Sequence, residues 1–221
     1  NCLSKVLSEN GKKQFRVTET TKYAHVTFFF NGEIETPFPG EERFLIDSIN
    51  TQDFSKYPKM RAKEITEKAC EAILSKKYDF VLINLSNPDM IGHTGDLKAT
   101  KKAIRFVDKC VKKLAEASLK VESDLIVTAD HGNAELMIDD NGVKVTSHTT
   151  NLVPIVLVSE KYKKCTLKDG KLADIAPTIL KLLNIEKPVE MTGESLLLGE
   201  DNPFYVCPST DPVDPKDKNF E

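Results

Sequence analysis

The alternation of buried strands and amphipathic helices along residues 77–184 constrains the fold more than any other feature of this sequence. Three short apolar runs have the length and composition of strands buried on both faces: residues 80–85 (FVLINL), 124–128 (DLIVT) and 154–158 (PIVLV). Apolar residues recur at helical spacing in three further segments: 62–74, 96–119 and 172–184. Alternating strands and helices are typical of a largely parallel sheet flanked by helices, so the sequence predicts an α/β fold.

The flanking segments are less regular. Residues 3–11 have the apolar spacing of a short helix that ends at a glycine. Residues 36–43 (TPFPGEER) are expected to be a loop because proline and glycine punctuate them. Residues 24–30 (AHVTFFF) have the β-branched and aromatic composition of a strand. Residues 198–221, with prolines set among Asp and Lys, are predicted to form a flexible tail.

Composition and charge argue against several classes of protein. The chain has 221 residues, 40% of them hydrophobic, which suits a single α/β domain with a buried core. The net charge is −3, and we interpret the basic run within residues 98–120 as the solvated face of a helix, so no nucleic-acid partner is expected. No membrane span or targeting segment is visible, and we expect a cytoplasmic protein. Five scattered cysteines without a C-x-x-C pair are expected to be reduced thiols.

Candidate metal ligands follow the predicted strands in three polar motifs: NPDMIGH at 87–93, TADHGNAE at 128–135 and SHTTN at 147–151. Open α/β sheets place their functional sites at the ends of their strands. In the first motif Asn87 can cap a helical turn and Pro88 can begin it. Asp89 and His93 then lie four residues apart and should face the same way.

The second and third motifs add ligands of the same type. Asp130 and His131 end a strand, where neighbouring side chains diverge, so this pair suits two ions better than one. His148 adds an imidazole just before the last strand. Any one histidine could be a cap or core residue, but three of the four histidines lie beside an Asp or a hydroxyl at strand ends, which favours a metal site. Carboxylate and imidazole ligands suit Mn²⁺, Mg²⁺ or Zn²⁺ alike. Two ions about 3.5–4 Å apart are typical of enzymes that displace groups at phosphorus.

These motifs resemble those of the cofactor-independent phosphoglycerate mutases, a family of the alkaline-phosphatase superfamily. Similar strings occur in the same order outside them: ETTKYAHVTFFFNG, PFPGEERFLI, LADIAPTILKLL and MTGESL. The resemblance implies an alkaline-phosphatase-like fold in which residues 1–197 are the carboxyl-terminal part of the metal-binding domain. It also implies a helix at residues 24–30, against the strand propensity of that segment, and both alternatives stay open.

The resemblance further implies a set of metal ligands. Asp89, His93 and His148 would hold one ion, while Asp130 and His131 would contribute to a second. Two Mn²⁺ ions are expected, with Mg²⁺, Co²⁺ and Zn²⁺ as alternatives.

Two further basic residues are interpreted through the same resemblance. Lys22 corresponds to the family's catalytic lysine beside the phosphorylated serine, although a plain surface role is the alternative for one of 31 Lys and Arg residues. His25, the remaining histidine, is expected to be structural.

The implied activity is the interconversion of 3-phosphoglycerate and 2-phosphoglycerate in glycolysis and gluconeogenesis through a phosphoserine enzyme. The family's serine, one further Asp ligand and the inserted substrate-binding domain lie upstream of what this sequence contains, and the chain begins without methionine. We therefore expect a fragment that is inactive alone, whose partners are phosphoglycerate and the missing amino-terminal part. Two alternatives stay open: another hydrolase or mutase of the superfamily, such as a phosphopentomutase or phosphodiesterase, and a non-catalytic binding module that keeps the fold.

Overall fold

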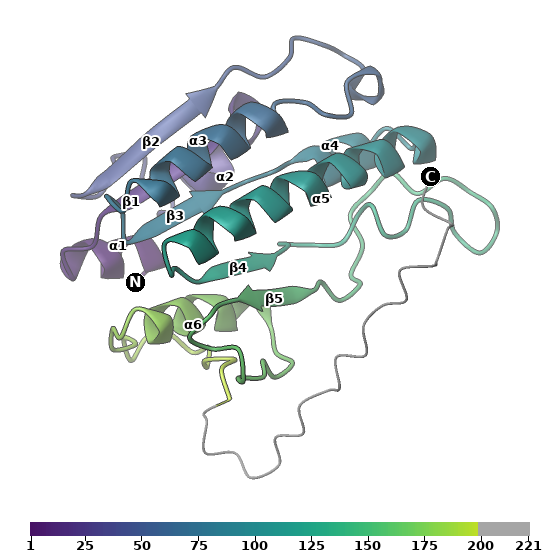
Figure 1. The fold of residues 1–221 in the computed structure, drawn as a ribbon. Helices are drawn as coiled ribbons and strands as arrows, with labels where there is room; N and C mark the ends of the chain where they lie inside the picture. Colours follow the sequence, from purple (N-terminus) through teal and green to yellow (C-terminus); the bar gives the residue numbers. More distant parts are fainter. Residues whose placement is uncertain (199–221) are drawn as a thin grey trace.

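The computed structural model describes residues 1–198 and contains a parallel and an antiparallel sheet (Figure 1). The parallel sheet has the order β2-β1-β3, with β1 (Gln14–Glu19), β2 (Glu41–Ile46) and β3 (Phe80–Ile83). The antiparallel pair is β4 (Leu125–Thr128) and β5 (Ile155–Val158). The helices are α1 (Leu3–Glu9), α2 (Tyr23–Val26), α3 (Ala62–Leu74), α4 (Asn87–Gly92), α5 (Leu97–Lys120) and α6 (Ile175–Leu182), and short 3-10 helices span Thr20–Lys22, Phe54–Lys56 and Leu172–Asp174. The predicted α/β class, with a parallel sheet flanked by helices, is confirmed.

Strand β1 is the central strand of the parallel sheet, and all six of its residues are buried. Its side chains alternate between the two faces of the sheet. Phe15 and Val17 pack against α3, while Arg16 donates hydrogen bonds to Ser4 Oγ at 2.8 Å and Gln14 Oε1 at 2.7 Å on the opposite face. Sequence reasoning does not assign this strand, because its polar residues resemble a solvated segment until their buried partners are known.

Helices α3 and α5 pack against each other and cover one face of the parallel sheet (Figure 1). Both match their predicted ranges within a residue, and Asp96 caps α5 by accepting a hydrogen bond from Ala99 N at 2.9 Å. The basic residues of α5 are solvated as expected. The helical spacing of its apolar residues predicts that Ile104 lies on the buried face, but Ile104 is 42% exposed, whereas the small residues Ala99 and Ala103 are buried. Small side chains on the buried face allow the helices to approach closely.

A second apolar cluster covers the opposite face. It joins α1 to α6 through Leu3, Val6, Leu7 and Leu180, with Phe30 and Phe80 packed beside them. The Arg16 guanidinium lies over the Phe30 ring at 4.5 Å from its centroid, so the buried cation is covered by an aromatic face. Helix α1 ends as predicted, since Gly11 has a φ of +66° that favours glycine.

The remaining local differences have local causes. Residues 41–43 belong to β2 rather than to a loop, because the edge of β1 offers them parallel hydrogen-bonding partners. Residues 24–30 begin in α2 and continue as turns, so neither alternative describes the whole segment. Residues 172–184 form a short 3-10 helix followed by α6, not one continuous helix. The predicted tail lies outside the described residues except for Leu198.

Strands β4 and β5 pair antiparallel, which the predicted strand and helix alternation did not include. The chain leaves β4, makes a long excursion and returns alongside it, so no helix crosses between the two strands. Within residues 1–198 no helix has the length and apolarity of a membrane span. Cys2, Cys70, Cys110 and Cys165 are free thiols, as expected, and Cys207 lies outside the described residues.

Candidate metal centre

Helix α4 places the first two candidate ligands. Three residues separate β3 from the helix, which has Pro88 in its first turn, and His93 follows the last residue of the helix. The prediction that Asn87 caps this helix is wrong: Ser86 is the N-cap residue, and the Asn87 side chain instead donates to the Pro58 carbonyl oxygen at 3.0 Å. The backbone N–H of His93 donates to the Asp89 carbonyl at 3.0 Å, and its Nε2 lies 3.1 Å from Asp89 Oδ1. The expectation that these two side chains face the same way is confirmed, because one helical turn brings residues four apart onto one side.

The excursion between β4 and β5 supplies the other imidazoles. His148 Nε2 lies 3.1 Å from Asp89 Oδ1 and 3.1 Å from His93 Nε2. The His131 ring stacks on His148 with centroids 3.6 Å apart. One donor atom from each of Asp89, His131 and His148 lies within 4.8 Å of the others, so three separate segments meet at one point.

The hydrogen bonds of the histidines fix which nitrogen faces the site. His93 Nδ1 lies 2.7 Å from the Thr146 carbonyl oxygen, and His131 Nδ1 lies 3.2 Å from the Gly132 carbonyl oxygen. A carbonyl only accepts, so both Nδ1 atoms carry protons, and in the neutral rings the Nε2 lone pairs are free to act as ligands. Oδ1 of Asp89 and the two Nε2 atoms of His93 and His148 form a triangle with sides of 3.1 Å. Such a triangle of lone pairs is stabilised by a shared proton or by a cation, so the donor set fits a divalent metal ion.

Asp89 is held ionised by its other neighbours. Lys22 Nζ lies 2.8 Å from Oδ2, and Asn133 Nδ2 donates to Oδ1 at 2.8 Å. Burial by itself would raise the pKa of Asp89, but the hydrogen bonds from Lys22 and Asn133 and the Lys22 charge lower that pKa to about 2. The carboxylate is therefore charged at neutral pH and available to a cation.

Asn133 is a site residue that sequence reasoning missed. Its side chain is buried against α4, and a Cβ at Gly92 would overlap its amide oxygen. The glycine therefore permits the contact that brings the loop after β4 onto Asp89. The only available signal was the position of Asn133 within the second motif.

The other predicted residues lie at different distances from this cluster. Asp130 has a side chain that is 70% exposed, and its Oδ2 lies 3.6 Å from Nε2 of its neighbour His131. Asp130 is not part of the group formed by Asp89, His131 and His148. His25 is exposed and packs edge-on against Phe29. Lys22 follows β1 closely and reaches the centre of the cluster through Asp89.

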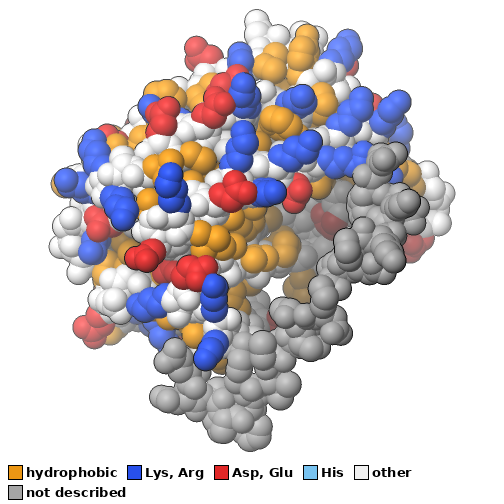
Figure 2. All heavy atoms as spheres, viewed as in Figure 1, with side chains coloured by type: hydrophobic (Ala, Val, Ile, Leu, Met, Phe, Trp, Pro, Cys, Tyr) orange, Lys and Arg blue, Asp and Glu red, His pale blue; other side chains and the backbone are white. Residues whose placement is uncertain are grey.

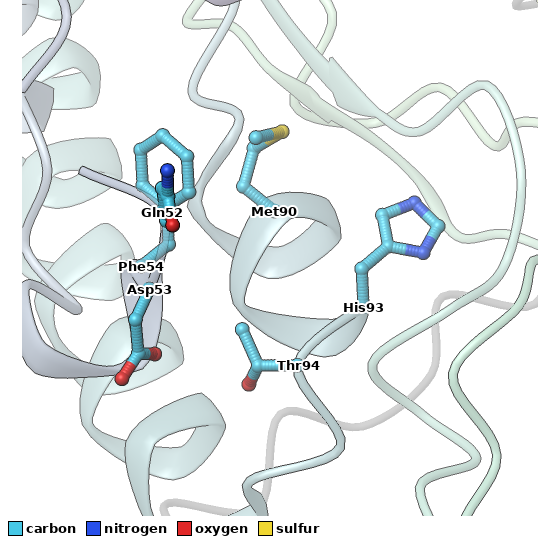
Figure 3. A pocket seen from close by; sticks show the side chains of 6 residues that line it. All are labelled: Gln52, Asp53, Phe54, Met90, His93 and Thr94. Carbon is cyan, nitrogen blue, oxygen red and sulfur yellow. The ribbon is translucent and has the colours of Figure 1, made fainter. Parts of the chain in front are cut away.

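An open pocket of about 410 Å³ adjoins the cluster, lined by Gln52, Asp53, Phe54, Met90, His93 and Thr94. Figure 3 shows Met90 and Thr94 on the side of α4 that faces Phe54 and Asp53, while the His93 ring points away from them. His93 belongs to both the pocket lining and the ligand cluster, so the two adjoin at the end of α4.

Comparison with known proteins agrees with this geometry. Residues 1–187 match the family model of the metalloenzyme superfamily. The chain is 48% identical over 198 residues to the 2,3-bisphosphoglycerate-independent phosphoglycerate mutase of Moorella thermoacetica, covering 90% of this chain and 38% of that protein. It is 52% identical over 198 residues to the same enzyme of Clostridium botulinum (strain ATCC 19397 / Type A), covering 89% of this chain and 39% of the relative.

A solved structure extends the likeness to three dimensions. A crystal structure of Leishmania mexicana phosphoglycerate mutase at low cobalt concentration matches with a TM-score of 0.82 and 35% sequence identity, covering 88% of this chain and 38% of that one. The chain thus spans well under half the length of each of these relatives. The chain belongs to the metalloenzyme superfamily and is homologous to the carboxyl-terminal part of the 2,3-bisphosphoglycerate-independent phosphoglycerate mutases.

Proposed function

We propose that this chain is the metal-binding part of a phosphoglycerate mutase that interconverts 3-phosphoglycerate and 2-phosphoglycerate in glycolysis and gluconeogenesis through a phosphoserine enzyme. The observation that carries the proposal is the convergence of Asp89, His93 and His148, with His131 stacked alongside, on one point beside Lys22. The relatives that bear the mutase name support the substrate class. A cytoplasmic location, as expected from the sequence, is part of the same proposal.

The ligands are assigned to two divalent ions. Asp89, His93 and His148 hold one ion, and Asp130 and His131 contribute to the second. Ions about 3.5–4 Å apart have neighbouring ligand shells, which is compatible with the stacking of His131 on His148. Mn²⁺ is the proposed metal, and Co²⁺, Mg²⁺ and Zn²⁺ accept the same ligand types. Bound ions would lower the negative charge on a phosphoryl group and favour ionisation of a serine hydroxyl.

Residues of this chain orient the candidate ligands and keep them available to a metal ion. Asp89 is kept ionised, and the Nδ1 bonds of His93 and His131 keep their Nε2 lone pairs turned toward the site. Lys22 is the proposed catalytic residue, since an ammonium group beside the metal ligands can bind phosphoryl oxygens. No hydroxyl of the chain is assigned as the nucleophile.

The proposed partner is the rest of the mutase, which would supply the serine, a further Asp ligand and the substrate-binding domain. Within residues 1–198, β3 pairs only with β1 and β4 pairs only with β5. Each of these strands therefore has one edge without a strand partner in this part of the chain, and added strands can pair with such edges.

Reconstitution tests the proposal. The purified chain with Mn²⁺ is expected to show no conversion of 3-phosphoglycerate, because nothing holds the phosphoryl group between its two positions. Addition of a separately produced amino-terminal part is expected to restore conversion, and His148→Ala is expected to abolish it. Mutase turnover by the chain alone, or a reconstituted enzyme that is indifferent to metal removal, would contradict the proposal.

A further inference from the structure

Glu135 joins the two loops that carry His131 and His148. Its carboxylate accepts hydrogen bonds from the Thr149 hydroxyl and from Asn151 Nδ2, the latter at 3.0 Å. It also accepts from the backbone N–H of Asn133 at 2.6 Å. One exposed side chain therefore holds the loop after β4 against the loop before β5, at the point where the two candidate ligands stack.

The connection continues from Glu135 to the histidine rings. Thr149 N donates to the Gly132 carbonyl oxygen at 2.9 Å, and His131 Nδ1 lies 3.2 Å from the same oxygen. A carbonyl oxygen has two lone pairs, so it can accept both donors. The position of Thr149 therefore fixes the carbonyl that orients His131, and Thr149 directly follows His148 in the chain.

Close packing leaves this arrangement little freedom. A Cβ at Gly132 would overlap both the Thr149 hydroxyl and the Glu135 carboxylate. Gly132 and Thr149 also form an antiparallel bridge, which aligns the two loops. The next backbone bridge between the two segments, Ile138 with Lys144, lies farther from the histidines, so the Glu135 bonds and the Gly132–Thr149 bridge are the links next to the rings.

We propose that Glu135 is a positioning residue. It acts through Thr149 to keep the His131 and His148 rings close enough together for both to bind metal. The inference rests on the proposed metal site and deepens it. Partners that orient metal-ligating histidines through their second ring nitrogen commonly change metal affinity about 10–100-fold when they are removed. Glu135 is exposed, so its removal should affect the site more than the packing of the core.

The test uses the full 221-residue chain with Glu135→Ala, Glu135→Gln, Thr149→Val and Thr149→Ser. Co²⁺ is the probe, because its visible absorption reports the ligand geometry. We expect Glu135→Ala and Thr149→Val to weaken Co²⁺ binding about 10–100-fold and to alter the spectrum. The Co²⁺ affinity of Glu135→Gln should lie between those of the parent and of Glu135→Ala, since Gln keeps one acceptor oxygen. Thr149→Ser should retain binding because it keeps the hydroxyl. The double variant should lose little more than either single variant, since both remove one connection.

Matched controls and a metal-free measurement complete the design. Glu190→Gln and Thr150→Val change exposed residues of the same types and should leave the Co²⁺ spectrum unchanged.

In the metal-free chain, nuclear Overhauser contacts between the His131 and His148 ring protons should be strong in the parent and lost in Glu135→Ala. This readout does not depend on mutase turnover or on metal binding, so its failure is distinguishable from failure of the proposed function. Preserved ring contacts in Glu135→Ala and Thr149→Val would overturn the inference.

Discussion

At the scale of single residues, Asp89 is the point on which the site depends. It contacts Lys22, His93, Asn133 and His148 through its two carboxylate oxygens. Sequence motifs predicted Asp89 as a ligand, but not the number of groups that converge on it. Its neighbours come from the 3-10 helix after β1, the carboxyl-terminal end of α4 and the β4–β5 excursion, which are distant in sequence.

The first prediction concerns metal binding. His93→Ala and His148→Ala should each lower the metal content of the purified chain, because each removes a lone pair from the cluster. Binding should also weaken at acidic pH, since protons compete with the metal for the ligand atoms. Equilibrium dialysis against Mn²⁺ at several pH values measures both effects. Unchanged stoichiometry in both variants would show that the ligands lie elsewhere.

A second prediction concerns the effect of Lys22 on the ionisation of Asp89. In the metal-free chain, Lys22→Ala should raise the pKa of Asp89 from about 2 toward its ordinary value, because a hydrogen bond and a positive charge are lost. The stabilisation from this carboxylate is present above its unfolded pKa and disappears as pH falls through the folded value, so it is complete at neutral pH. NMR titration of Asp89 measures the shift.

The same variant should affect activity more than stability. In the reconstituted mutase, Lys22→Ala is expected to lower turnover strongly, whereas the loss of stability should be limited to that of the single ion pair with Asp89. Nearly full turnover would show that the proposed catalytic role is wrong.

At the scale of elements, α4 links the core to the site: its packing against the core determines where its ligand side chains lie. Ile91 is fully buried in a cluster with Met60, Ala99 and Ala103, while Asp89 and His93 project from the same short helix. A helix of six residues has little stability of its own, so its position depends on this contact with α5.

A third prediction follows from that packing. Ile91→Ala should lower the free energy of unfolding by about 2–5 kcal/mol, because it leaves a cavity under α4. Ile104→Ala is the matched control on α5: its side chain is 42% exposed, so the loss should be much smaller. Urea unfolding monitored by circular dichroism gives both values. Equal losses in the two variants would contradict the burial described for α5.

At the scale of the whole molecule, the sheets are joined by helices and loops rather than by strand pairing. Helix α5 contacts β4, and its Leu114 lies in the same apolar cluster as Val17 of β1, so α5 connects the two sheets. Figure 2 shows orange hydrophobic side chains gathered between the charged residues of this face. Val156 of β5 and Leu152 before it are examples of exposed apolar side chains, at 50% and 96%.

The fourth prediction concerns association. Because free strand edges and exposed apolar side chains favour pairing, the isolated chain should self-associate at raised concentration. Adding the amino-terminal part of the mutase should replace self-association by a defined complex, which sedimentation velocity can follow. A monomer that ignores the added part would argue against the proposed partner.

Local sequence predicted the α/β class, the ranges of α3 and α5, and the Asp and His side chains that meet, although it also included Asp130, which lies outside their group. These are local properties: helical periodicity, the Asp96 cap and ligand types at strand ends depend on neighbouring residues only. Tertiary structure alone decided that polar β1 is the central strand, that β4 and β5 pair antiparallel, and that Ile104 faces outward while Ala103 is buried. It also brought Lys22, Asn133 and His131 to Asp89 and His148. The physical reason is that hydrogen bonds and close packing between distant segments satisfy polar groups and select helix faces that local sequence leaves undetermined.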